Sequence, residues 1–189
     1  MAAADLDDPE FIAALRRDMV RFADLQLRDR AAAEDAVQEA LAAALAQRER
    51  FESRASLRTW VLSILKNKVV DAIRLRCRQA AAPVDDDADL DSWFDERGHW
   101  SEDTRPADWG NPEQDLNSKQ FWEVFEACLH RLPEAPARAF LMREVMGFDT
   151  DEICTTLTIT ANNCFVLLHR ARLALRACLG ERWFAGAAA

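Results

Sequence analysis

The chain has 189 residues, half of them hydrophobic, and a formal net charge of −9 at pH 7. This length allows one domain or two small ones, with enough apolar residues to bury a core. The acidic N-terminal segment lacks an apolar run, so we expect no signal peptide, and no run of about 18 apolar residues predicts a membrane span. Tyr is absent and only five residues are Gly, which favours helices over sheets.

The negative charge is concentrated in one segment. Residues 1–79 hold 14 basic and 13 acidic side chains, residues 119–189 hold 8 of each, and residues 80–118 hold 2 basic and 12 acidic ones. The connector therefore carries the excess, and two nearly neutral lobes with local basic patches flank it. The acidic whole chain is thus compatible with binding to nucleic acid.

Three helices are predicted in the N-terminal lobe, over residues 9–27, 31–50 and 56–79, because apolar residues recur there at helical spacing. Pro9 stands where the first helix can begin. The second helix is expected to bury Val37, Leu41, Ala44 and Leu45. Its exposed N-terminal end carries Glu34, Asp35, Gln38 and Glu39. Compensation of the helix dipole is the ordinary explanation of the three carboxylates and would suffice on its own.

The third helix combines a buried arc with a basic one. The arc expected to be buried holds Leu57, Trp60, Val61, Ile64, Leu65, Ala72 and Leu75. The opposite arc holds Lys66, Val70, Arg74 and Arg78, with Asn67 beside them. Such a stripe is a possible phosphate footprint, although a solvated face is the commoner meaning.

Four helices are predicted in the C-terminal lobe, over residues 119–132, 134–146, 149–157 and 161–179. Gly147 is expected to end the second, and Asp149 with Glu152 to open the third as a capping box. The last two helices and their tight turn form a helix-turn-helix pattern. The last helix should bury Cys164, Leu167, Leu168, Ala171, Leu175 and Cys178. Its outward face should carry Asn162, Phe165, Val166, His169, Arg172 and Arg176.

The five cysteines are Cys77, Cys128, Cys154, Cys164 and Cys178. Their number is odd, none forms a C-x-x-C pair, and no secretion signal precedes them, so we expect reduced thiols in a cytoplasmic protein. Packing inside helices explains them better than a metal site does. The scattered residues His99, His130 and His169 add no ligand pattern. We therefore expect neither a metal nor a cofactor.

Four motifs in one order carry a family resemblance: "AEDAVQE" at 33–39, "SLRTW" at 56–60, "LPEAPAR" at 132–138 and "LHRAR" at 168–172. This order closely resembles the extracytoplasmic-function sigma factors of bacterial RNA polymerase. The resemblance covers both lobes but not the termini or the connector. The fold expected is all-α.

The expected organisation has two small helical domains. An N-terminal helical bundle spans residues 1–79, and a four-helix domain with the helix-turn-helix spans 118–183. A flexible acidic linker, 80–117, joins them, and a disordered tail, 184–189, follows.

The resemblance assigns roles in the N-terminal lobe. Asp35, Gln38 and Glu39 match the segment that grips the clamp helices of the largest polymerase subunit. The loop that captures a base flipped from the −10 element matches Phe51, Glu52, Ser53, Arg54 and Ser56. The helix that holds the non-template strand matches Lys66, Asn67, Asp71 and Arg74, and the basic stripe adds Arg78.

In the C-terminal lobe the outward face of the last helix matches the −35 recognition helix. The candidate residues are Asn162, Asn163, Phe165, Val166, His169, Arg170, Arg172 and Arg176. Many relatives carry Lys or Arg and Ser at the positions of Phe165 and Val166, so bidentate contacts to guanine are absent there. The two asparagines can pair with adenine, and the two apolar residues can meet thymine methyl groups. A protein partner for this apolar patch is an equal alternative.

The connector of related proteins threads into polymerase channels that nucleic acid uses. An extended acidic chain mimics the charge of nucleic acid, and Trp93, Phe94, Trp100 and Trp109 can anchor it. Its composition predicts disorder in the free protein, and a plain solubilising linker is the alternative. The implied partners are core RNA polymerase, through its clamp helices and flap region, promoter DNA and an anti-sigma factor. No membrane insertion is expected.

The function predicted is therefore that of a promoter-specificity subunit without catalysis. A helix-turn-helix regulator that binds duplex DNA without polymerase is the alternative. It would have no use for "DAVQEA" and "SLRTW", and it would usually dimerise on a palindrome. An enzyme would need a convergent nucleophile, acid–base pair or metal set, and the sequence presents none.

Overall fold

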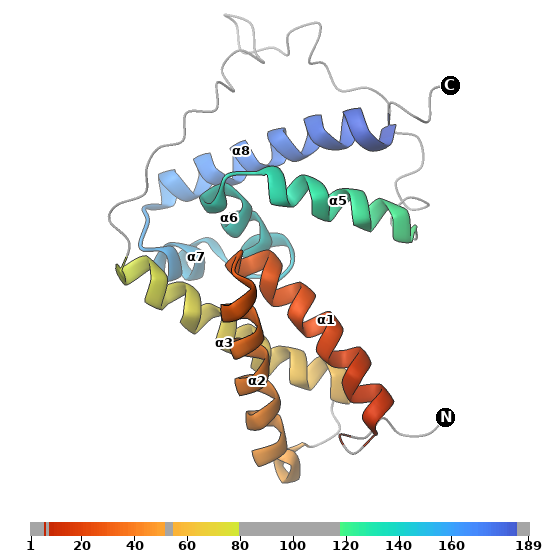
Figure 1. The fold of residues 1–189 in the computed structure, drawn as a ribbon. Helices are drawn as coiled ribbons and strands as arrows, with labels where there is room; N and C mark the ends of the chain where they lie inside the picture. Colours follow the sequence, from red (N-terminus) through yellow and green to blue (C-terminus); the bar gives the residue numbers. More distant parts are fainter. Residues whose placement is uncertain (1–5, 7, 52–54, 80–117, 185–189) are drawn as a thin grey trace, which may run out of the picture. The chain divides into compact units, whose positions relative to one another are not determined.

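The structure is a computed structural model that describes residues 6, 8–51, 55–79 and 118–184. Within these ranges every regular element is helical, as the ribbon in Figure 1 shows, and the expected all-α class is confirmed. The predictions for Glu52, Ser53 and Arg54, for the connector 80–117 and for the tail beyond residue 184 fall outside the described residues. No helix in the described part is both long and apolar enough to cross a membrane.

The described residues fall into two compact units. The first joins the N-terminal helices to residues 141–160, and the second joins residues 118–140 to residues 161–184. The predicted domain limits at the connector stay a prediction.

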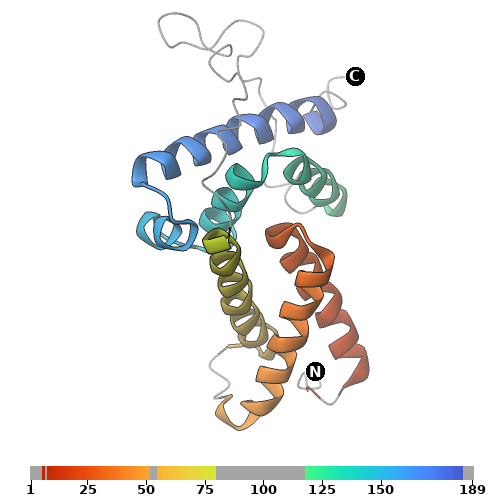
Figure 2. The ribbon, with the colours of Figure 1, turned by 60° about the vertical axis from the view of Figure 1, so that its left-hand side comes forward.

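The first unit contains α1 (Pro9–Leu27), α2 (Arg30–Ala46), a short 3-10 turn (Arg48–Arg50), α3 (Leu57–Gln79) and α7 (Thr150–Leu157). Pro9 begins α1 as predicted, and the Asp8 side chain accepts a hydrogen bond from the backbone N–H of Glu10. Arg28 ends α1 in the left-handed region at φ 49°, and Asp29 immediately caps α2. The chain therefore reverses within two residues, and both views of the ribbon show α1, α2 and α3 side by side (Figures 1 and 2).

The core of this three-helix bundle combines large residues from α1 and α3 with small ones from α2. The fully buried side chains include Leu15, Met19, Leu27, Val37, Val61, Leu65 and Ile73. Four alanines of α2 are also buried: Ala33, Ala36, Ala40 and Ala44. Their small side chains leave room for close approach of the neighbouring helices.

Three predicted orientations in this bundle are wrong. Leu45 and Leu75, expected in the core, are 55% and 49% exposed, whereas Val70, expected to face outward, is buried. For α3 the reason is that it packs against α1, α2 and α7. Contact with three helices buries Val69, Val70 and Ile73, and the exposed arc is shifted accordingly.

The segment that precedes α7 follows the predicted local signals. Gly147 takes a left-handed φ of +70° and ends the helix before it. The Asp149 side chain accepts from the Glu152 N–H at 2.8 Å, and the Glu152 carboxylate accepts from the Asp149 N–H at 2.9 Å. The predicted capping box is therefore confirmed. Thr158 ends α7 at φ 58°, and α8 begins at Ala161.

The second unit contains α5 (Lys119–Arg131), the first turns of α6 (Glu134–Glu144), α8 (Ala161–Leu179) and a π-helical segment (Gly180–Phe184). Aromatic side chains gather on α5 and its neighbours. Phe121 meets the Trp183 ring edge-on at 5.6 Å, and Phe125 lies 6.4 Å from Phe140. These contacts join α5 to the C-terminal segment and to α6.

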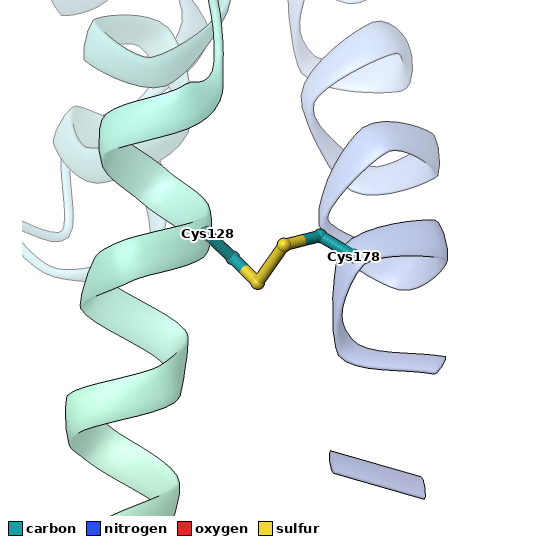
Figure 3. Close-up of a disulfide and its surroundings, with 2 residues drawn as sticks. All are labelled: Cys128 and Cys178. Atoms are coloured by element: carbon teal, nitrogen blue, oxygen red, sulfur yellow. A yellow bond between two sulfur atoms is a disulfide. The ribbon is translucent and has the colours of Figure 1, made fainter. Parts of the chain in front are cut away.

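A disulfide links α5 to α8 within this unit. Cys128 and Cys178 point toward each other in Figure 3, and their Cα atoms are 5.8 Å apart. The expectation of reduced thiols is wrong for this pair, whereas Cys77, Cys154 and Cys164 are not part of a disulfide. Sequence spacing did not reveal the pair because helix packing brings together residues that are 50 positions apart.

Candidate nucleic-acid interface

The exposed polar end of α2 is the first candidate surface. Asp35, Gln38 and Glu39 are exposed and lie within four positions, so they share one helix face. The Glu39 carboxylate pairs with the Lys68 ammonium at 2.9 Å. Two exposed side chains, Asp35 and Gln38, therefore stand beside an ion pair that connects this face to α3.

Capping of α2 is performed by Asp29 rather than by this exposed face. The Asp29 carboxylate accepts from the backbone N–H of Ala32 at 3.1 Å and from the Arg76 guanidinium at 2.5 Å. The Ala32 N–H, followed by the charge of Arg76, holds the pKa of Asp29 below its ordinary value of 3.8. The N-terminus of α2 is thus capped by Asp29, and Asp35 and Gln38 are not needed for this capping.

The second candidate surface begins at the loop between the 3-10 turn and α3. The described ends of this loop are both anchored. The ring of Phe51 lies 5.3 Å from that of Trp60, and both residues are half-buried. The Ser56 hydroxyl oxygen accepts from the backbone N–H of Thr59 at 3.1 Å and bonds the Thr59 hydroxyl at 2.8 Å. Ser56 therefore organises the start of α3, a local role that the sequence analysis missed.

Four predicted residues form one exposed stripe along α3: Asn67, Asp71, Arg74 and Arg78. They recur every three or four positions, which places them on one face. The Arg74 guanidinium lies 3.5 Å from the Asp71 carboxylate, a long contact between exposed groups that costs little to open. The stripe thus presents one amide, one carboxylate and two guanidinium groups to the solvent.

Lys66 does not belong to this exposed stripe. It is half-buried, its ammonium donates to the Met146 carbonyl at 2.6 Å, and the same nitrogen lies 4.2 Å from the centre of the Phe148 ring. Both partners belong to the same compact unit. The predicted stripe of Lys66, Val70, Arg74 and Arg78 is therefore exposed at Arg74 and Arg78, whereas in its first half Val70 is buried and Asn67 and Asp71 take the exposed positions.

The third candidate surface is the outward face of α8. Asn162, Phe165, Val166, His169 and Arg172 are exposed, while Asn163, Arg170 and Arg176 are half-buried. Phe165 is 58% exposed, an unusual position for a large aromatic side chain. The opposite face is buried through Cys164, Leu167, Leu168, Ala171 and Leu175, so the predicted division of this helix into two faces is confirmed for these residues.

The described residues show no candidate metal site. They contain no group of three His, Cys, Asp or Glu side chains able to hold an ion. The candidate surfaces instead present amides, guanidinium groups and apolar side chains, which suit contacts with phosphates and base edges.

Comparisons with known proteins agree with the motifs. The family model for sigma-70 region 2 matches residues 11–79, and that for sigma-70 region 4 matches residues 122–175. A protein of Haemophilus influenzae, described as a probable RNA polymerase sigma factor, is 37% identical over 169 residues, which cover 89% of this chain and 87% of that protein.

A solved structure of the sigma factor RpoE from Bartonella quintana, in complex with the anti-sigma factor NepR, is 22% identical. The match has a TM-score of 0.44 and covers 92% of this chain and 96% of that chain. The two region matches and the sequence identity over most of both lengths are decisive: the chain belongs to the sigma-70 family of RNA polymerase sigma factors, and to its extracytoplasmic-function type.

Proposed function

We propose that the three exposed surfaces divide the work of this sigma factor between polymerase binding, −10 recognition and −35 recognition. As a sigma factor, the protein binds core RNA polymerase and directs promoter recognition and DNA melting at transcription initiation. The single observation that carries the proposal is the exposed stripe of Asn67, Asp71, Arg74 and Arg78 within the region 2 match.

The polar end of α2 binds the clamp helices of the largest polymerase subunit. Support comes from the exposure of Asp35 and Gln38 and from the capping of α2 by Asp29, which leaves these two side chains without a structural task at the helix start. Glu39 contributes through its ion pair with Lys68, which orients its carboxylate.

The α3 stripe and the preceding loop hold the melted −10 element. Extruding a base costs a few kcal/mol of stacking, so pocket and backbone contacts must offset this cost. Arg74 and Arg78 supply phosphate contacts, and Asn67 supplies a donor and an acceptor for a base edge. The loop matched by Phe51, Glu52, Ser53, Arg54 and Ser56 captures the flipped base, and Lys66 joins the interface after leaving Met146.

The outward face of α8 binds the −35 element. Asn162 and Asn163 are suited to adenine, while Phe165 and Val166 are suited to thymine methyl groups. His169, Arg170, Arg172 and Arg176 follow the phosphate backbone along the same helix. The apolar character of positions 165 and 166 predicts a preference for A·T pairs in this half of the promoter.

The proposed location, domain limits and further partners follow from the role of a sigma factor in transcription. The protein acts in the cytoplasm with its polymerase, performs no catalysis and uses no cofactor, since RNA synthesis belongs to the polymerase. The domains are residues 1–79 and 118–183, and the acidic connector occupies basic polymerase channels. An anti-sigma factor is the further partner proposed.

Assembly of the holoenzyme from core polymerase tests the role proposed for α2. Asp35→Ala combined with Gln38→Ala should weaken binding to core polymerase while circular dichroism stays unchanged. Glu34→Ala is the matched control, because Glu34 lies on the same helix end but pairs with Arg30 at 2.9 Å. Core affinity equal to that of the unmodified protein would refute the role of α2.

A further inference from the structure

The disulfide between α5 and α8 lies in the unit that contains the −35 face. Cys128 is fully buried, whereas Cys178, in the last turn of α8, is half-buried. Figure 3 shows one bond that connects two helices, so it restrains α8 against α5 directly. The part of the −35 face proposed to contact bases, Asn162 to Val166, occupies the other half of the same helix, whereas Arg172 and Arg176 lie nearer to the bond.

A second contact joins α5 to the chain after α8. The Phe121 ring meets the Trp183 ring edge-on at 5.6 Å, five residues beyond Cys178. The bond and this aromatic contact together hold the C-terminal end of α8. Without the bond, packing and the aromatic contact alone would hold this end of α8 against α5.

A disulfide in a protein that works in the cytoplasm points to a reversible role. Structural disulfides persist in oxidising compartments, whereas those of cytosolic proteins are commonly transient and redox-sensing. This step rests on the proposed function, which places the protein with RNA polymerase. We propose that Cys128 and Cys178 form a reversible redox-sensitive tie that strengthens binding of α8 to −35 DNA when it is oxidised.

The chemistry balances with hydrogen peroxide as the oxidant. The Cys178 thiolate, the more accessible sulfur, attacks one peroxide oxygen; a sulfur–oxygen bond forms, the oxygen–oxygen bond breaks and hydroxide leaves. The Cys128 thiolate then attacks the sulfenic sulfur, forms the disulfide and displaces a second hydroxide. Each hydroxide takes up one thiol proton, so two thiols and one peroxide yield the disulfide and two waters.

Reduction follows by exchange with a dithiol. One thiolate of the reductant attacks the disulfide through a mixed disulfide, its second thiolate resolves this intermediate, and two electrons and two protons return to the cysteines. Because Cys178 is half-buried and Cys128 is buried, the reductant is expected to attack Cys178 and release Cys128. The other three cysteines take no part.

The experiment compares oxidised and reduced full-length protein in reconstituted holoenzyme. Thiols are alkylated and counted by mass spectrometry across a series of glutathione redox buffers. Affinity is measured on promoter fragments that the holoenzyme has selected from a randomised −35 library. We expect the oxidised protein to have two fewer alkylated thiols, located at Cys128 and Cys178, and to bind the selected fragments severalfold more tightly.

Matched variants separate the tie from general effects of cysteine replacement. Cys154→Ser should keep the redox response, because this half-buried residue lies outside the pair. Cys128→Ala combined with Cys178→Ala should bind equally in oxidising and reducing buffer, at the affinity of the reduced protein. Comparison of the two redox states of the unmodified chain needs no variant, so misfolding of a variant cannot obscure the result.

Two outcomes would overturn different statements. Equal, sequence-specific binding by oxidised and reduced protein would refute the tie and leave the −35 assignment standing. A pair that stays oxidised in every glutathione buffer, or never oxidises, would also refute it. Loss of all −35 sequence preference in both redox states would instead refute the role proposed for α8, and with it the regulation.

Discussion

The Arg76 guanidinium lies 2.5 Å from the Asp29 carboxylate and also donates to the Leu27 carbonyl at 2.5 Å. One side chain near the end of α3 therefore fixes the reversal of the chain between α1 and α2. Asp29 in turn accepts from Ala32 and caps α2. The three helices of the bundle thus meet at a single polar junction.

Acid should weaken this junction. The pKa of Asp29 is lowered, first by the Ala32 N–H and then by Arg76, so its contribution to stability is present above the ordinary value of 3.8 and is lost as pH falls below it. Asn at this position can still cap the helix but carries no charge. Asp29→Asn should therefore lose less stability than the unmodified protein between about pH 5 and about pH 2.

Thermal unfolding followed by circular dichroism at a series of pH values measures this difference. Asp18→Asn is a suitable control, since Asp18 pairs with Arg58 at 2.6 Å on an exposed surface without capping a helix. Parallel pH profiles for the unmodified protein and Asp29→Asn would contradict the assignment.

Gln26 should be replaceable with a gain in stability. It is 2% exposed, and among the described residues neither amide atom has a hydrogen-bond partner. A buried unsatisfied polar group costs about 1–3 kcal/mol. Gln26→Met keeps a similar length without the amide and should raise the free energy of unfolding by about this amount in urea titration. A decrease would indicate that ordered water satisfies the amide.

Asn67 and Arg74 should contribute differently to promoter binding. Asn67→Ala should reduce open-complex formation on a natural promoter more than it reduces non-specific DNA binding. Arg74→Ala should weaken binding to all sequences and flatten its salt dependence, because a phosphate contact releases counterions. Potassium permanganate footprinting measures the open complex, and a salt titration measures the slope. Identical effects on sequence preference would show that the two roles are not separate.

Phe165→Ser should distinguish DNA from protein as the partner of the apolar patch. If Phe165 meets a thymine methyl group, the substitution should cost about 1–3 kcal/mol of preference for that base pair. Replacing the thymine by uracil, which lacks the methyl group, should then weaken binding of the unmodified protein but not of the variant. Unchanged selection at every −35 position would favour a protein partner instead.

The predictable features are those set by neighbours along the chain. The capping box of Asp149 and Glu152 and the left-handed Gly147 follow from local backbone chemistry, and both were predicted. The two faces of α8 were also predicted, because one side of this helix is consistently apolar. Local signals therefore suffice to divide this helix into a buried and an exposed face, whereas its role in −35 recognition comes from the family resemblance.

Features that depend on distant partners were predicted poorly. The exposed face of α3 differs from the predicted one because periodicity alone does not show that α1, α2 and α7 all pack against this helix. Lys66 was expected on the outward basic arc, yet its ammonium donates to the carbonyl of Met146, 80 positions away in the sequence. The Cys128–Cys178 pair depends likewise on packing between helices that are distant in sequence.

The alanines of α2 limit what a standard mutational scan can detect. Ala33, Ala36, Ala40 and Ala44 already occupy the buried face, so replacement by alanine leaves this contact untouched. Apart from Val37, such a scan would detect α2 mainly through its polar side chains and would underestimate its contribution to folding. Substitution by valine or leucine would add methyl groups where the neighbouring helices lie close, and a loss of thermal stability there would reveal the contact by overpacking.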